Sequence, residues 1–476
     1  MQNFPQIPRL DRRQFLWRFG GGLGGIALAH LLSESGLLAD THGLVGDHLH
    51  HAPKAKRVIQ LFMNGGVSQC DTFDPKPLLT KLHGQKFDPG SRVEAATSMP
   101  GSVMKSPFEF KQHGKSGRWV SSVFPHLACH VDDMAFIMSM ASKTNVHGPG
   151  SYMMNTGFVL PGFPCMGSWI SYGLGSLGNN LPTFVVMPDP RGLPYNNLGN
   201  FSSGFLPVAH AGTVIKPTAP EPIADLFPPK DAKYVTKQGD ADGLALLDQI
   251  NRDHAQQHPG DSRLDARISS YELAAKMQLS APEVLDLGGE SAETRALYAL
   301  DDKVSEEFGR RCLVGRRMLE RGVRFVQIWS GASGNKNNWD NHGDIPSELP
   351  PMAAATDKPI AGLLADLKQR GMLDDTLVVW STEFGRMPFS QGSTGRDHNG
   401  GTSVSWLAGG GIRAGTSFGE SDEWSWKART PTYCYDLHAT ILHLLGIDHK
   451  RLTFRHNGID RRLTDVHGEL IEPIIG

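Results

Sequence analysis

The sequence predicts an α/β fold in which a mostly parallel central sheet has helices on both faces and carries a helical insertion. Six short apolar runs are continuous rather than alternating, which is typical of strands that are covered on both faces. Helical patterns lie between these runs, and this alternation favours a parallel sheet between two helical layers. The six runs expected to form strands are 58–63, 135–140, 183–187, 323–329, 376–380 and 404–408.

Two of the helical patterns have clear ends. Apolar residues at helical spacing predict helices over 354–370 and 437–445, and a glycine follows each as a stop signal. Residues 239–321 also read as mostly helical. We therefore predict one α/β domain over residues 57–476, with a helical insertion at about 216–321.

Composition excludes several classes of protein. Lys and Arg number 47 and Asp and Glu 49, and this near-balance argues against a nucleic-acid partner, which favours a basic excess. The five cysteines include no CxxC pair, so neither a zinc ribbon nor a dense disulfide framework is indicated. The unusual count is that of histidine, at 20. Because imidazole is a common metal ligand and acid/base, this count directs attention to a metal or catalytic site.

The first 32 residues predict an export signal. Arg12 and Arg13 precede a Phe-Leu pair and a weakly apolar stretch, which resembles a bacterial twin-arginine signal. An ordinary amphipathic helix is the alternative, and glycines interrupt the stretch, so we expect no stable membrane span. We predict a signal at 1–32, a disordered lead-in at 33–56, the twin-arginine export machinery as a partner, and a periplasmic or extracellular location.

Polar clusters follow several predicted strands, where binding sites form in open α/β sheets. Each cluster has an alternative reading as a turn or as an ion pair that fixes a loop. Carboxylates together with imidazoles suit Zn, Mn or Fe better than Ca, which prefers oxygen alone. Such an ion could polarise a phosphoryl or sulfuryl oxygen. The predicted ligands of one or two divalent ions are Asp340, His342, Glu383, Asp397 and His398.

These motifs resemble a sulfatase-like domain-of-unknown-function family of Tat-exported bacterial proteins, within the alkaline-phosphatase/sulfatase-like superfamily. The resemblance extends over nearly everything after about residue 56 and implies an alkaline-phosphatase-like fold with a metal centre. The segments that carry it are 64–77, 339–342, 382–386, 395–399, 435–449 and 457–465.

The sequence departs from the superfamily pattern at four points. Asn64 stands where a metal-binding Asp normally ends the first strand, and Glu383 keeps a carboxylate but loses the ligand beside it. His147 stands at the nucleophile position, ahead of a Thr-Gly pair, and could instead bind a metal or an anion. None of the cysteines lies in the Cys-x-Pro/Ala-x-Arg sequence that formylglycine formation requires. Formylglycine chemistry is therefore not expected.

The interpretation that follows is an exported metal-dependent hydrolase-like protein acting on a phosphate or sulfate ester, whose substrate is an anionic small molecule or glycan. The alternative is a non-catalytic secreted binding protein for anionic glycans on the same scaffold. In the first interpretation His147 and Arg386 are catalytic. The residues expected to bind the substrate are Asn64, Gly65, Gly66 and Arg396.

Overall fold

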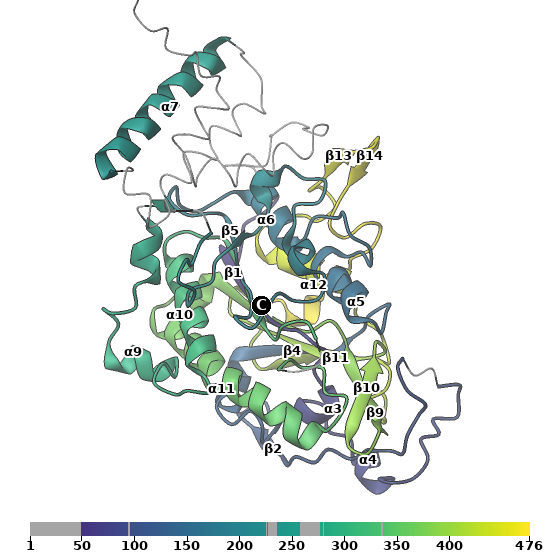
Figure 1. Ribbon diagram of the computed structural model, residues 1–476. Helices are drawn as coiled ribbons and strands as arrows, with labels where there is room; N and C mark the ends of the chain where they lie inside the picture. Colours follow the sequence, from purple (N-terminus) through teal and green to yellow (C-terminus); the bar gives the residue numbers. More distant parts are fainter. Residues whose placement is uncertain are drawn as a thin grey trace, which may run out of the picture.

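An eight-stranded sheet forms the centre of the molecule (Figure 1). The computed structural model describes residues 49–93, 96–224, 226, 236–257, 277–278, 280–334 and 337–476. In order across the sheet, the strands are β12 (Thr416–Phe418), β4 (Met134–Met140), β11 (Ser403–Ala408), β8 (Thr376–Ser381), β1 (Arg57–Met63), β7 (Phe325–Ser330), β5 (Phe184–Met187) and β6 (Thr213–Val214). β11 is antiparallel to both neighbours, whereas the other neighbouring pairs are parallel. The predicted α/β class with a mostly parallel sheet is confirmed.

The six apolar runs correspond to β1, β4, β5, β7, β8 and β11. Their continuous apolar character has a direct cause, because alternate side chains of each strand enter different cores. In β1, Ile59, Leu61 and Met63 belong to one core, and Val58 and Phe62 to the other. A central strand in such a sheet has no solvent-facing side, so it carries no polar alternation.

Helices cover both faces of the sheet (Figure 1). The helix predicted over 354–370 is part of a longer helix that already begins at Ile345 and contains Pro350, Pro351 and Pro359. Because proline normally interrupts a helix, the sequence pattern placed the start too late. The helices of one core are α10 (Glu306–Glu320) and α11 (Ile345–Gln369), and those of the other are α5 (His147–Thr156), α6 (Met166–Leu174) and α12 (Cys434–Leu444).

The segment predicted as an insertion has two parts in the structure. α7 (Lys237–Gln257) lies away from the sheet (Figure 1). In contrast, α10 packs against β7 and α11 and so belongs to the main helical layer. α9 (Ala292–Leu297) also contacts α11. Part of this segment lies outside the described residues, including most of the stretch between α7 and residue 280.

Residues 1–48, which contain the expected signal and most of the expected lead-in, lie outside the described residues. The final residues of that lead-in lie against α12: the backbone N–H groups of Lys54 and Ala55 donate to the carbonyl of Leu444 at 2.8 Å. Within the described ranges, no helix combines the length and apolar character that crossing a bilayer requires.

Short elements lie outside the central sheet. They comprise the helices α3 (Gln69–Thr72) and α4 (Pro77–Lys81), the strand pairs β2 (Phe110–His113) with β3 (Arg118–Ser121), β9 (Gly385–Gln391) with β10 (Gly395–Asn399), and β13 (Phe454–His456) with β14 (Ile459–Arg461), and the 3-10 helices η1 (Leu127–Asp133), η2 (Asn197–Phe201), η3 (Val208–His210), η4 (Leu373–Asp375) and η5 (Glu472–Ile474).

Candidate metal centre

The carboxyl ends of the parallel strands bring together residues that are far apart in the chain. The segment after β4 leads to His147, the first residue of α5. The loop after β7 carries Asp340 and His342, and Glu383 follows β8 directly. The β9–β10 hairpin adds His398. These side chains meet because the carboxyl ends of parallel strands share one edge of the sheet.

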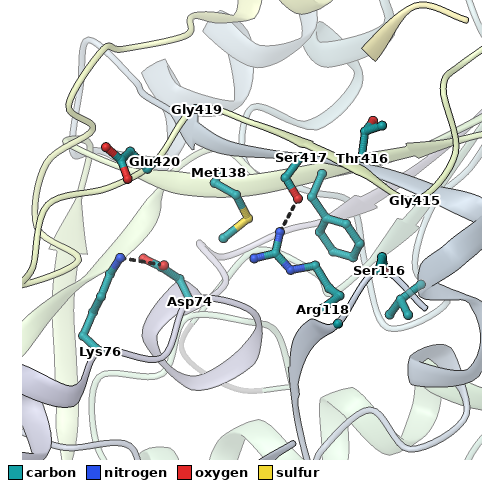
Figure 2. A pocket seen from close by; sticks show the side chains of 13 residues that line it. Asp74, Lys76, Ser116, Arg118, Met138, Gly415, Thr416, Ser417, Gly419 and Glu420 are labelled. Atoms are coloured by element: carbon teal, nitrogen blue, oxygen red, sulfur yellow. Dashed lines mark hydrogen bonds and ion pairs between the residues drawn. The ribbon is translucent and has the colours of Figure 1, made fainter. Parts of the chain in front are cut away.

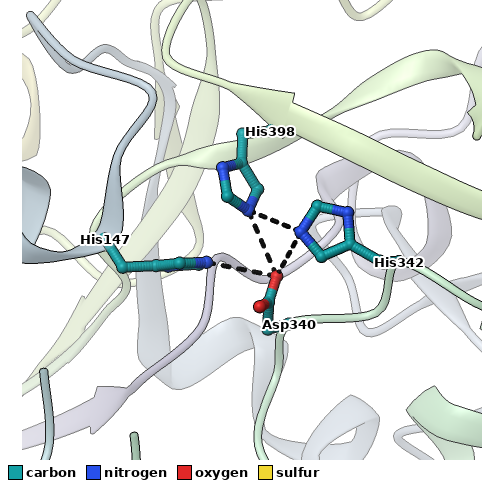
Figure 3. A group of neighbouring side chains, drawn as sticks. All are labelled: His147, Asp340, His342 and His398. Atoms are coloured by element: carbon teal, nitrogen blue, oxygen red, sulfur yellow. Dashed lines mark hydrogen bonds and ion pairs between the residues drawn. The ribbon is translucent and has the colours of Figure 1, made fainter. Parts of the chain in front are cut away.

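Three imidazoles surround one carboxylate oxygen (Figure 3). The Nε2 atoms of His147, His342 and His398 lie 3.1, 2.8 and 3.2 Å from Oδ1 of Asp340. The Nε2 atoms of His342 and His398 are 2.7 Å apart. All four candidate ligand atoms lie within 4.8 Å of one another. The group can therefore hold a metal ion.

The other nitrogen of each ring already has a partner. A carboxylate or carbonyl oxygen only accepts a hydrogen bond, so the Nδ1 atom facing it carries the proton and, in a neutral ring, Nε2 carries a lone pair. Metal-binding histidines are held by such outer partners. The Nδ1 atoms of His147, His398 and His342 face Glu383 Oε1 at 2.7 Å, the Asn145 carbonyl at 2.7 Å and Gln391 Oε1, respectively.

This arrangement fits a metal better than it fits a closed hydrogen-bond network. If the three rings are neutral, their Nε2 lone pairs and the carboxylate oxygen repel one another unless a cation lies between them. Nε2 of His147 is buried and makes no hydrogen bond. A donor set of three imidazole nitrogens and one carboxylate oxygen suits Zn, Mn or Fe. The residues present therefore fit the predicted divalent ion.

Charge in the cluster shifts the pKa values in different directions. Burial lowers the pKa of His398 to about 4, which keeps that ring neutral. Burial also acts to lower the pKa of His147, but the adjacent carboxylates of Asp340 and Glu383 outweigh it and raise the pKa. Burial opposes ionisation of Asp340, yet the three imidazoles and Arg386 hold its pKa well below the usual range.

The structure places His147 and Glu383 differently with respect to the cluster. His147, expected as the reacting group or else as a ligand of a metal or an anion, is one of the four candidate ligands. Glu383, expected as a ligand, instead accepts from His147 Nδ1 at 2.7 Å and from the Gly65 N–H at 2.8 Å. Its second oxygen accepts from Thr382 Oγ1 at 3.1 Å. Glu383 therefore orients the ring that faces the cluster.

Arg386 is not placed as a free clamp for a substrate anion. Its guanidinium is fully buried and donates to the carbonyls of Gly66 at 2.7 Å and Arg396 at 3.0 Å, and also to that of Gly65. It also binds Asp340 Oδ1 at 2.5 Å. Oxygen atoms of the protein therefore accept the hydrogen bonds of this guanidinium. In this way Arg386 connects the turn after β1 to the loop that carries Asp340.

The glycines after β1 approach the protein itself rather than an open ligand space. A Cβ on Gly65 would lie 2.5 Å from the backbone nitrogen of Asp340, and one on Gly66 would lie 2.7 Å from the Phe384 ring. Both glycines have positive φ, at 125° and 77°. Asn64 is also buried: its Nδ2 donates to the Gly331 carbonyl at 3.2 Å, while its Oδ1 has no hydrogen-bond partner.

The structure places Arg396 and Asp397 outside the cluster. Arg396 is fully buried and pairs with Asp71 at 2.6 Å. Asp397 accepts from the backbone and hydroxyl of Thr97 and from Ser98, with 2.6 Å to the Thr97 hydroxyl. The pairing of β10 with β9 is irregular between Arg396 and His398, and at this irregularity Asp397 turns away from the cluster while His398 faces it. These corrections leave His398 as the ligand candidate of β10.

Tyr195 is a residue of the site that sequence reasoning missed. Its ring stacks on His147 with the centroids 4.4 Å apart, and its hydroxyl lies 3.5 Å from Oδ2 of Asp340. Burial and the charge of Asp340 raise the pKa of Tyr195, so the phenol stays protonated. It follows β5 as the other site residues follow their strands, but an isolated Tyr among Pro and Asn gives no chemical signal. Asn145 and Gln391 were missed for the same reason.

Residues 55–475 match a family model described as "Protein of unknown function (DUF1501)". No curated protein matches the chain.

Solved structures with some likeness include three bacterial proteins. The lipoteichoic acid synthase LtaP of Listeria monocytogenes is 11% identical, with a TM-score of 0.36 over 90% of this chain and 78% of that one. The PsFucS1 sulfatase of Pseudoalteromonas sp. is 13% identical, with a TM-score of 0.34 over 90% of this chain and 72% of that one. The alkaline phosphatase of the Antarctic bacterium TAB5 is 12% identical, with a TM-score of 0.31 over 83% of this chain and 98% of that one. Likenesses this weak decide nothing about the chemistry of the site.

Proposed function

We propose that this chain, which belongs to the DUF1501 family of proteins of unknown function, is an exported metal-dependent hydrolase-like protein that acts on a phosphate or sulfate ester without formylglycine. One observation carries the proposal. The Nε2 atoms of His147, His342 and His398 converge on Asp340 Oδ1, while each Nδ1 is held by an oxygen acceptor. The substrate in this proposal is an anionic small molecule or glycan.

The same four side chains would hold a divalent ion, which supplies a Lewis acid for a phosphoryl or sulfuryl oxygen when bound. The chain's own residues prepare that site. Glu383 holds the Nδ1 proton of His147, and Arg386 fixes the carboxylate of Asp340. Since Arg386 is fully engaged, the substrate's negative charge would be met by the ion. The protonated hydroxyl of Tyr195 lies beside the carboxylate and donates to the Gly334 carbonyl at 3.2 Å.

The cysteines support a reaction without a thiol-derived nucleophile. Burial raises the pKa of Cys70 to about 12 and that of Cys165 to about 11. A thiol with such a pKa is almost wholly protonated at neutral pH and is a poor nucleophile. Neither residue stands in a formylglycine sequence.

A second candidate function is a secreted protein that binds anionic glycans without turnover. The departures from the superfamily pattern favour it, because Asn64, in place of the usual metal-binding Asp, bonds to the Gly331 carbonyl and is not among the candidate ligands. His147, which stands at the nucleophile position of the superfamily pattern, aims its free Nε2 at the ligand cluster instead. In this reading the ion completes a binding surface and no bond is broken.

Elemental analysis of the purified protein tests the metal, with His398→Ala and Asp340→Asn as site variants and the exposed His83→Ala as the matched control. We expect about one divalent ion per chain in the wild type and in H83A, and strong depletion in both site variants. Failure of the wild type to retain Zn, Mn or Fe after loading and desalting would refute the proposal.

A panel of chromogenic phosphate and sulfate esters then separates the two candidates. Turnover that disappears in H398A and D340N supports the hydrolase. Metal retention with no turnover of any ester, together with saturable binding of sulfated or phosphorylated oligosaccharides, supports the binding protein.

Export remains a proposal that rests on Arg12 and Arg13, which lie outside the described residues. It implies the twin-arginine machinery as a partner and a periplasmic or extracellular location. Replacing both arginines with lysine should leave the full-length protein in the cytoplasm of a producing bacterium, as measured by cell fractionation. Unchanged export of that variant would refute this route.

A further inference from the structure

A cavity of about 310 Å³ lies at an edge of the central sheet, and it shares no lining residue with the candidate metal centre (Figure 2). β3, β4 and β12 contribute to its walls, together with the segment after α3. Figure 2 shows the guanidinium of Arg118 on one side and the Lys76–Asp74 pair on the other, with Met138 between them. The volume is at the lower end of the range for small-molecule sites.

Arg118 has an incomplete set of partners. Its Nη1 donates to Ser417 Oγ at 2.5 Å, and its guanidinium lies 5.1 Å from the centroid of the Phe136 ring. Its Nε is buried and has no hydrogen-bond partner. In the described part of the chain, no carboxylate forms an ion pair with Arg118. The contact with the Phe136 ring and the hydrogen bond to the Ser417 hydroxyl are therefore the main local interactions that stabilise the positive charge of Arg118.

The carboxylates of the cavity already have cations of their own. Asp74 pairs with Lys76 at 2.9 Å, and Glu420 pairs with Arg429 at 3.2 Å. Arg118 consequently remains as one uncompensated positive charge. A partly desolvated cation without a counter-ion is costly, and burial lowers the pKa of Arg118 even though Asp74 acts in the opposite direction.

The other residues that line the cavity indicate what the uncharged part of a ligand would be. Phe136, Met138 and Val131 line the cavity and provide apolar surface next to the guanidinium. A doubly charged group would exceed the one free positive charge and would face Asp74 and Glu420. We propose that this cavity binds a small organic molecule through a singly charged oxyanion group, a carboxylate or a sulfate ester, held by Arg118 with its organic body against Phe136 and Met138.

Calorimetric titration with four phenyl compounds tests the site on the full protein. Benzoate and phenyl sulfate carry one negative charge, phenyl phosphate is mostly doubly charged at pH 8, and benzamide is neutral. We expect saturable binding of at least one of the two monoanions, with phenyl phosphate and benzamide at least about tenfold weaker. The monoanion that binds more tightly identifies the oxyanion. No saturable binding of either monoanion, or tighter binding of phenyl phosphate, would overturn the proposal.

Matched variants locate the binding. Ser417→Asp places a carboxylate against Arg118 and should abolish binding, whereas Ser417→Ala removes only the hydroxyl and should change the Kd less than about threefold. Arg118→Gln should weaken binding at least about tenfold, while the same change at the exposed Arg455 should not. If R118Q fails to fold, the Ser417 pair still decides. Binding that is equal in S417D and S417A, or that is lost in D340N, would overturn this location.

Discussion

Two groups of buried polar residues in this protein differ in how well their hydrogen-bonding atoms match. Within the sheet, Gln327 Nε2 donates to Gln60 Oε1 at 2.9 Å and to Asn155 Oδ1 at 2.7 Å, and Gln327 Oε1 accepts from Trp329 Nε1 at 3.0 Å. At the carboxyl edge, the Nε2 atoms of three imidazoles converge on Asp340, and that of His147 has no hydrogen-bond partner. A matched network stabilises the fold, whereas an unmatched one indicates a site for something the chain does not supply.

The largest expected effect concerns Arg386. It lies at the carboxyl edge of the sheet, beside the cluster, but its hydrogen-bond donors have partners in the protein. Arg386→Met would leave Asp340 and several carbonyls without their donor, so we expect a loss of about 3–5 kcal/mol in the free energy of unfolding. Urea denaturation measures it, with Arg455→Met on the surface as control. Unchanged stability with only a weaker substrate interaction would restore Arg386 as an anion clamp.

A smaller loss is expected from Gln327→Leu in the matched network. Trp329, Gln60 and Asn155 would each lose a buried partner, which should cost about 2–3 kcal/mol of unfolding free energy. Metal affinity should change little, because Gln327 is no part of the cluster. Exposed Gln112→Leu is the control in the same denaturation series. A Gln327→Leu variant that keeps full stability but loses the metal would contradict the assignment of Gln327 to the network that stabilises the fold.

Glu383→Gln should change metal affinity without removing a ligand. The amide would hold the His147 ring less strongly, so we expect affinity to fall about 10–100-fold, as for other outer partners of metal-binding histidines. Competition with a chelator measures it, and exposed Glu472→Gln serves as control. A loss as complete as that in His398→Ala would show that Glu383 is itself a ligand.

The effect expected to be smallest at neutral pH comes from His438, a buried imidazole outside the cluster, and it grows as the pH falls. Burial lowers its pKa to about 4, and its Nε2 bonds to the Met154 carbonyl at 2.9 Å. Because the folded pKa lies below the unfolded value of 6.5, the unfolded chain takes up the proton first as pH falls. Stability should therefore decline between pH 6.5 and about 4, by at most about 1.4 kcal/mol per pH unit.

His438→Gln should flatten this part of the stability curve when both proteins are denatured in the presence of a chelator. Identical slopes for the two proteins would contradict the assignment to His438.

The sheet was predictable because its signal is local. The strands β1, β4 and β8 are buried on both faces, so each reads as an unbroken apolar run, and the edge where polar residues meet follows from their direction. That reasoning placed Asp340, His342 and His398 at one edge before their contacts were known.

The sequence did not predict which residues at that edge are candidate ligands and which hold the ligands in place. Whether Glu383 binds a metal or the ring of His147 depends on a few ångströms between segments more than two hundred residues apart in the chain. Asp397 and His398 are adjacent and both could be metal ligands, and only the local irregularity of β10 decides which one faces the cluster. Gly65 predicts a close approach, but the sequence does not say that the backbone of Asp340 makes it.

The cluster draws its ligands from widely separated parts of the chain, and only Asp340 and His342 are near neighbours in sequence. An unfolded or partly synthesised chain therefore presents at most this pair, and the complete set exists only after the sheet and the β9–β10 hairpin have formed. If the protein leaves the cytoplasm already folded, as proposed, the ion is acquired before export. The metal supply of the cytoplasm, rather than that of the surroundings where the protein works, would then decide which element it carries.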